Sequence, residues 1–136
     1  IPNPELRDEF RRNLRGIGAH IGIFAYTAAV AAYRHGEPWY QALMQYLKVN
    51  KALLQEEISK IDGLSLQGPE ATYLAWIDCS ESGLDAPSDF FINAGVGVHR
   101  GEWFGDSNFV RLNFGCPRSR LEEALNRIKK AFSQRN

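Results

Sequence analysis

One ten-residue stretch near the C-terminus constrains the fold most, and it reads FVRLNFGCPR from Phe109 to Arg118. Its first half has the two-residue period of a strand, with an apolar set on one face and a mixed set on the other: Val110, Leu112 and Phe114 against Phe109, Arg111 and Asn113. Because the apolar set can face a core, Arg111 and Asn113 must point away from that core together. Gly115 and Pro117 then end the strand, and an amphipathic helix follows.

Arg111 is the side chain in this stretch that is best suited to binding. An arginine held on a strand is a rigid, permanently charged donor with two prongs, which matches the geometry of a carboxylate. The pattern alone leaves two roles open. Arg111 either binds a carboxylate ligand or pairs with an acidic side chain on the surface, and surface pairs of that kind are common and weak.

The segment before this strand divides at Asp62-Gly63, a turn signal at which the pattern changes from helical to alternating. Three helices are expected upstream of it: one from Asn3-Pro4-Glu5, one over 21–34 and one from Pro38 onward. The helix over 21–34 is apolar around most of its circumference, as expected of a helix buried on several sides.

Downstream of Asp62-Gly63 the sequence predicts strands over 64–67, 72–79, 95–99 and 109–114, with helices over 87–94 and after Pro117. Both faces of the segment 72–79 carry bulky residues, so it is expected to be central in the sheet, with Tyr73 and Trp76 in the core. Strands and helices do not alternate as βαβ units. The chain is therefore predicted to be α+β, with a mostly antiparallel sheet and helices on one face (62–136), preceded by a long helical arm (1–61).

Charge and cysteine content limit the possible partners. The 136 residues hold 16 basic and 16 acidic side chains, so no overall field attracts nucleic acid or an anionic membrane. The apolar run from Ile21 to Tyr33 is shorter than the roughly 20 residues of a membrane helix. No signal peptide is visible, and Cys79 and Cys116 are expected to be reduced thiols. These features favour a cytoplasmic protein.

No catalytic set can be assembled from residue spacing. The three histidines, His20, His35 and His99, have no cysteine or carboxylate at metal-ligand spacing, so no metal site is expected. Gly16 and Gly18 follow a helix rather than a strand, unlike a nucleotide-binding loop. The lysines lie on helices among other charges, and nothing marks one of them as desolvated.

The stretch around Arg111 resembles the C-terminal signature of the pyridoxal-phosphate (PLP) class I/II aminotransferase superfamily. Within it, the best match is the branch of carbon–sulfur lyases of cystathionine β-lyase type. The likeness keeps family order and spacing through four further segments: Pro2–Pro4, Ala31–Trp39, Ala71–Cys79 and Gly101–Gly105. The resemblance implies the small C-terminal domain of a fold-type I PLP enzyme. Since the chain begins with Ile1-Pro2 rather than with Met, it is expected to be part of a longer enzyme.

The resemblance also implies an activity and a set of roles. The full enzyme would be a homodimer that uses PLP to eliminate a thiol from a small amino acid such as cystathionine, leaving pyruvate and ammonia. Arg111 would hold the substrate α-carboxylate, Asn113 would orient Arg111, and Trp103 and Phe104 would wall the pocket. The lysine that carries PLP would lie upstream, so no catalytic or cofactor-binding residue is expected here and the chain alone should be inactive.

Two other functions remain open at this stage. An aminotransferase of the same superfamily would share the arginine and the cofactor. A stand-alone, non-catalytic module or regulatory partner would keep the fold without the chemistry. The apolar stripe from Ile21 to Tyr33 argues against the module, because such a helix would expose more apolar surface than the few hundred Å² usual for a monomer. The isolated chain is therefore expected to self-associate or to need an upstream domain.

Overall fold

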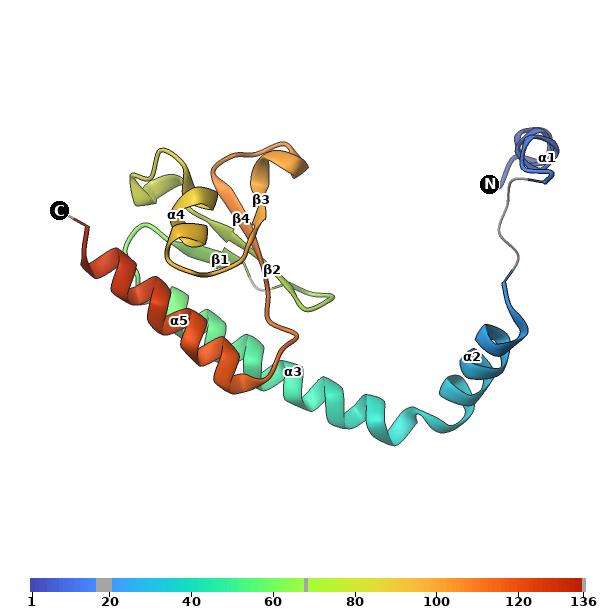
Figure 1. Cartoon of the computed structure of the whole chain (residues 1–136), viewed down its shortest axis with the longest axis horizontal. Coiled ribbons are helices and arrows are strands. Elements are labelled where there is room, and N and C mark those ends of the chain that lie inside the picture. Colours follow the sequence, from blue (N-terminus) through green and yellow to red (C-terminus); the bar gives the residue numbers. More distant parts are fainter. Residues whose placement is uncertain (17–20, 68, 136) are drawn as a thin grey trace. The chain divides into compact units, whose positions relative to one another are not determined.

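The computed structural model describes residues 1–16, 21–67 and 69–135 (Figure 1). Gly18 and His20, which the sequence analysis considered, lie outside these ranges. The chain forms two compact units, Ile1–Tyr40 and Gln41–Asn136. The second unit begins inside a long helix, earlier than the turn at Asp62-Gly63. The division of 1–61 and 62–136 into an arm and a domain of a larger enzyme stays a prediction.

The first unit contains the helices α1 (Pro4–Asn13) and α2 (Ile23–His35). Asn3 caps α1 as predicted, because its side-chain oxygen accepts a hydrogen bond from the Leu6 backbone N–H at 3.1 Å. Helix α2 is described throughout and has no buried residue; Phe24 is 87% exposed and Tyr33 is 94% exposed. The burial that its sequence predicts is therefore not provided by the described residues.

The second unit is an α+β fold, as predicted. Helix α3 (Glu37–Ile58) begins before it and is followed by β1 (Ser65–Gln67), β2 (Leu74–Asp78), α4 (Pro87–Asn93), β3 (His99–Arg100), β4 (Phe109–Asn113) and α5 (Arg118–Ser133). Two short 3₁₀ helices, η1 (Ser80–Ser82) and η2 (Gly101–Phe104), lie in the connections. The strands pair in the order β1-β2-β4-β3, and every neighbouring pair is antiparallel. Strand β2 is thus central, as expected.

Helices cover one face of this sheet and build the core there. Figure 1 shows α5 and the C-terminal part of α3 side by side beneath the strands. The buried residues of the two central strands are Ala75 and Ile77 of β2 and Val110 and Leu112 of β4. They pack in one cluster with Leu54 and Ile58 of α3 and with Leu121, Leu125 and Ile128 of α5. The alternation predicted for the strand of Arg111 is confirmed, because Val110, Leu112 and Phe114 are all buried.

The third predicted strand is the main error in the sequence analysis of this unit. The segment 95–98 is not a strand, and β3 contains only His99 and Arg100. Gly95 has a φ of +79°, a left-handed conformation that turns the chain after α4. Arg127 fixes this turn by donating a hydrogen bond to the Gly95 carbonyl at 2.8 Å. A turn held in this way leaves only the residues after it free to pair with β4.

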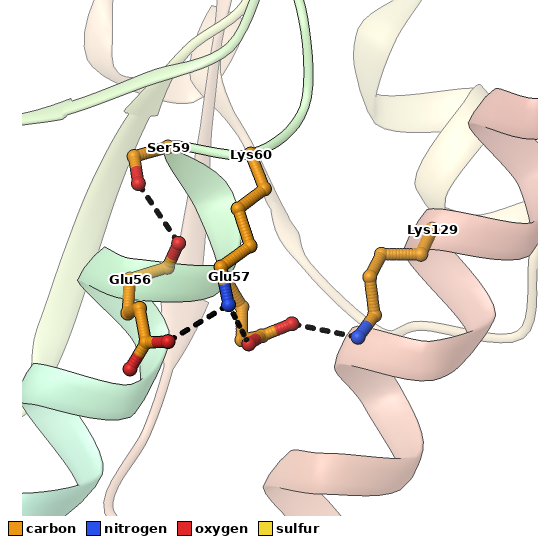
Figure 2. A network of polar contacts seen from close by, with 5 residues as sticks. All are labelled: Glu56, Glu57, Ser59, Lys60 and Lys129. Carbon is orange, nitrogen blue, oxygen red and sulfur yellow. Dashed lines mark hydrogen bonds and ion pairs between the residues drawn. The ribbon is translucent and has the colours of Figure 1, made fainter.

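Several polar contacts join α3 to the rest of the second unit, among them those of Asn50 and Glu57. The buried Asn50 amide donates to the carbonyls of Phe114 (3.1 Å) and Cys116 (2.9 Å), which follow β4. Nearer the end of α3, Glu57 accepts from Lys129 of α5 at 2.6 Å and from Lys60 at 2.7 Å (Figure 2). These hydrogen bonds, chiefly the one from Lys129, lower the pKa of Glu57 to about 2. The helical layer is thereby fixed to the end of the strand that carries Arg111.

Candidate functional site

The open face of the sheet carries Arg111 at its centre. Strand register pairs Arg111 with Trp76 on β2 and with His99 on β3. Residues paired across neighbouring strands project from the same face, so the three side chains form one row. Since Val110 and Leu112 point into the core, this row lies on the face opposite to the helices.

The Arg111 guanidinium has two close neighbours. Its Nε lies 3.3 Å and its Nη2 lies 2.7 Å from Nδ1 of His99. Its central carbon also lies 4.3 Å from the centroid of the Phe104 ring, in cation–π geometry. Among the described residues no carboxylate forms an ion pair with Arg111, whereas its neighbour Arg100 pairs with Asp89 at 2.5 Å. The pairing with a surface acid that the sequence left open is not observed.

A cluster of aromatic rings lies beside Arg111 on the open face of the sheet. Trp76 stacks on Phe109 with 5.2 Å between centroids and 10° between planes, and it meets the edge of Phe104 at 5.5 Å. Trp103 is 67% exposed, and its ring centroid lies 5.9 Å from that of His99. The cluster is thus partly exposed to solvent on the open face of the sheet. A half-buried guanidinium beside these rings can bind a planar anion while one of its flat faces is shielded from water.

The loop that supplies Trp103 and Phe104 depends on a glycine. A Cβ at Gly101 would lie 2.1 Å from the Asp106 carbonyl oxygen and 2.2 Å from that of Phe109. Only glycine therefore allows η2 to lie directly against the start of β4. This close approach places the ring of Phe104 beside Arg111.

Asn113 shares the open face but its oxygen is used locally. Its Oδ1 accepts a hydrogen bond from the Gly115 backbone N–H at 2.8 Å, which shapes the turn after β4. Its role in orienting Arg111 stays a prediction. The same holds for Trp103 and Phe104 as walls of a substrate pocket, although the structure does place both beside the row of Arg111.

Sequence reasoning missed two members of the site. Trp76 was assigned to the core, but it lies half-buried on the open face, and Tyr73 is 48% exposed. Alternation against the buried Ala75 and Ile77 could have placed Trp76 correctly. His99 was considered only as a metal ligand. No sequence signal could have paired it with Arg111, because the pairing depends on the register of a strand two residues long.

The other reactive groups of the described residues have ordinary structural surroundings. Burial raises the pKa of the Cys79 thiol to about 12, so this cysteine is a poor nucleophile. Lys51 donates to the Pro69 carbonyl at 2.8 Å, and Lys60 and Lys129 bind Glu57. Within the described ranges no group of three histidine, cysteine or acidic residues could hold a metal ion, and no helix has the length and hydropathy needed to cross a bilayer.

Comparison with known proteins gives consistent relatives over most of the chain. No family model matches it. A putative cystathionine beta-lyase of Mycobacterium leprae is 35% identical over 132 residues, which cover 84% of this chain and 32% of that protein. Cystathionine beta-lyase PatB of Bacillus subtilis is 34% identical over 144 residues, which cover 98% of this chain and 36% of that protein. The chain thus spans about a third of the length of these relatives.

Solved structures agree with the sequence relatives. OvoB superposes with a TM-score of 0.92 at 45% identity, covering all of this chain and 36% of that one. A putative PLP-dependent beta-cystathionase from Corynebacterium diphtheriae superposes with a TM-score of 0.85 at 37% identity, covering all of this chain and 37% of that one. The predicted fold, a small domain with an antiparallel sheet and helices on one face, is confirmed by this match.

Proposed function

Because this chain is homologous to the C-terminal region of PLP-dependent carbon–sulfur lyases of cystathionine β-lyase type, we propose that it binds the substrate α-carboxylate in such an enzyme. The reaction is an α,β-elimination on a small amino acid such as cystathionine, which releases a thiol and leaves pyruvate and ammonia. The observation that carries the proposal is Arg111, a strand-held guanidinium with no acidic partner among the described residues.

Arg111 contributes to this reaction by orienting the substrate. Two N–H groups of a guanidinium hold both oxygens of a carboxylate in one plane, which fixes the direction of the bonds at the α-carbon. The Phe104 ring lies against one flat face of the guanidinium and is itself in contact with Trp76, so water is kept from that face. When bound, PLP supplies the sink for the electron pair that is left at the α-carbon.

The residues of this chain suit the carboxylate better than the cofactor. The described lysines either bond to glutamates and backbone carbonyls or are exposed, as Lys48 and Lys130 are. We therefore place the lysine that carries PLP, and the groups that hold its phosphate, in the rest of the full-length enzyme. The exposed apolar side chains of α2 support a partner surface for that helix in the complete protein, which we propose is a cytoplasmic homodimer.

The test compares an amino-acid substrate with the amine that lacks only its carboxylate, in the full-length PLP-loaded enzyme. Wild type should bind the amino acid more tightly than the amine. Arg111→Ala should lose on the order of 10- to 100-fold of that preference, the value of a charged bidentate contact, while the visible spectrum of the bound cofactor is unchanged. An unchanged preference would overturn the role of Arg111.

The aminotransferase remains a second candidate because a probable aspartate/prephenate aminotransferase of Aquifex aeolicus is 36% identical over 85 residues. Product analysis separates the two activities. A lyase releases thiol and ammonia without a keto-acid acceptor, whereas an aminotransferase needs the acceptor and returns a new amino acid. Dependence of turnover on an added keto acid would replace the lyase proposal with the transferase.

A further inference from the structure

We propose that His99 is a positioning residue for Arg111, and this inference rests on the carboxylate role proposed above. The hydrogen-bond chemistry of the pair has only one solution. An arginine has donors and no acceptor, so Nδ1 of His99 must accept from Nη2 at 2.7 Å and from Nε at 3.3 Å. An imidazole that accepts through Nδ1 carries its proton on Nε2.

This contact decides which edge of the guanidinium is free. Nε and Nη2 form one of the two edges that can bind a carboxylate with parallel hydrogen bonds, and His99 occupies that edge. Phe104 covers one flat face of the group at 4.3 Å. The edge formed by Nη1 and Nη2 remains for the substrate, so the carboxylate approaches end-on, along the axis of the side chain.

The backbone explains why His99 can do this. Register places His99 directly across from Arg111, and the neighbouring Arg100 is fixed by Asp89 of α4. The ring centroid of Trp103 lies 5.9 Å from that of the His99 imidazole. Because Gly101 has no side chain, the loop that follows it can lie directly against the start of β4. The two-residue strand is therefore held at both ends, and the imidazole is presented to Arg111 from a defined position.

The experiment measures the preference for an amino acid over its decarboxylated amine in three variants of the full-length PLP-loaded enzyme. His99→Leu removes the acceptor and should lower the preference by roughly tenfold, the value of one hydrogen bond to a charged group. His99→Asn keeps an acceptor oxygen close to the position of Nδ1 and should retain most of the preference. Arg111→Ala should lower the preference on the order of 10- to 100-fold, as stated above, and sets the lower limit of the scale.

The variants separate this inference from the proposed function. A loss of the preference in His99→Leu together with its retention in His99→Asn supports the positioning role. Asparagine restores only the acceptor oxygen, and that acceptor would not matter if the histidine had a merely structural role. If Arg111→Ala loses the preference and both His99 variants keep it, the positioning role is overturned and the carboxylate role stands. If Arg111→Ala keeps the preference, both proposals fall.

A spectroscopic measurement covers the case in which His99→Leu does not fold. In wild-type enzyme labelled with ¹⁵N-histidine, the His99 ring is assigned as the signal that is missing from His99→Asn. The proposal expects the tautomer with the proton on Nε2 and an unprotonated Nδ1. A protonated Nδ1 would overturn it, because that nitrogen could not accept from Arg111.

Discussion

The two faces of the sheet are built from the same strands and yet follow different rules. On the covered face, Ile77 and Val110 have no exposed surface and pack against the helical layer. On the open face, the residues beside them in sequence, Trp76 and Arg111, are half-buried and contact rings and an imidazole. A step of one residue along each strand thus separates core packing from the site that we propose binds a carboxylate.

The difference shows which face stabilises this unit and which face is open for the proposed binding of substrate. Burial of apolar side chains on the covered face stabilises the fold and fixes the strands. Side chains on the open face are attached to the same rigid strands. Their positions are therefore defined, even where a charged group such as Arg111 has no acidic partner among the described residues. Substitutions on the two faces should therefore have separable effects, and four measurements test that distinction.

The largest effect on stability is expected from Ile77→Ala on the covered face. Deleting a fully buried isoleucine side chain to alanine should lower the free energy of unfolding by about 2–5 kcal/mol, because a cavity is left among the helices. Arg111→Ala is the matched control on the neighbouring strand and should lower it by about 1 kcal/mol or less, because it removes only partly exposed contacts to His99 and Phe104. Urea titration measures both. Equal losses in the two variants would mean that the faces are not distinct.

Asn50→Ala should have the next largest effect. The substitution leaves the carbonyls of Phe114 and Cys116 without the donor that binds them, which should cost about 1–3 kcal/mol. Lys48 is exposed on the same helix, so Lys48→Ala serves as a control with a change within about 0.5 kcal/mol. Because Asn50 holds the end of β4, this variant tests whether the covered side positions the open face. A loss no larger than that of the control would contradict this link.

Trp76→Leu probes the open face with a smaller expected loss. The variant keeps an apolar side chain but removes the stack on Phe109 and the edge contact with Phe104, which together exceed simple burial by about 0.5–1.5 kcal/mol. Its counterpart Leu74→Ala changes the same face of the same strand but removes no contact between two rings. A drop in urea midpoint that is specific to Trp76→Leu would confirm that the rings form a layer. Equal drops would show that only buried area matters.

How much of this could be predicted from the sequence depends on whether a feature is local. The alternation around Arg111 sufficed to assign Val110 and Leu112 to the core and Arg111 to the other face, because the period of a strand is set by the backbone itself. The partner of Arg111 could not be predicted in this way. It depends on the register of His99, and the close approach of Gly101 to β4 is visible only in three dimensions.

Predictions of burial failed for a related reason. Within the single helix α3, Trp39 near its start is 69% exposed while Leu54 near its end is fully buried. Of the strand expected over 95–99, only His99 lies in β3, because Arg127, 32 positions away, fixes the turn at Gly95. Periodicity identifies the side of an element that can be buried, whereas the neighbouring elements decide how much of it is.

The smallest effect should come from the charged contacts of Glu57, and it should depend on pH. Hydrogen bonds from Lys129 and Lys60 lower the pKa of Glu57 from 4.5 to about 2, so the carboxylate is stabilised in the folded state. A group with a lowered folded pKa adds stability above its unfolded pKa. That contribution should be complete above pH 4.5 and should disappear as the pH falls to about 2.

Glu57→Gln and Glu56→Gln form a matched pair for this measurement. Both carboxylates bind Lys60, but Glu57 alone of the two also reaches Lys129 on α5 (Figure 2). Urea midpoints between pH 2 and pH 7 should converge for wild type and Glu57→Gln as the pH falls, while Glu56→Gln stays closer to wild type throughout. Parallel curves for wild type and Glu57→Gln would mean that the contact between the helices adds nothing through its charge. The layer of α3 and α5 would then be held mainly by apolar packing and by uncharged hydrogen bonds such as those of Asn50.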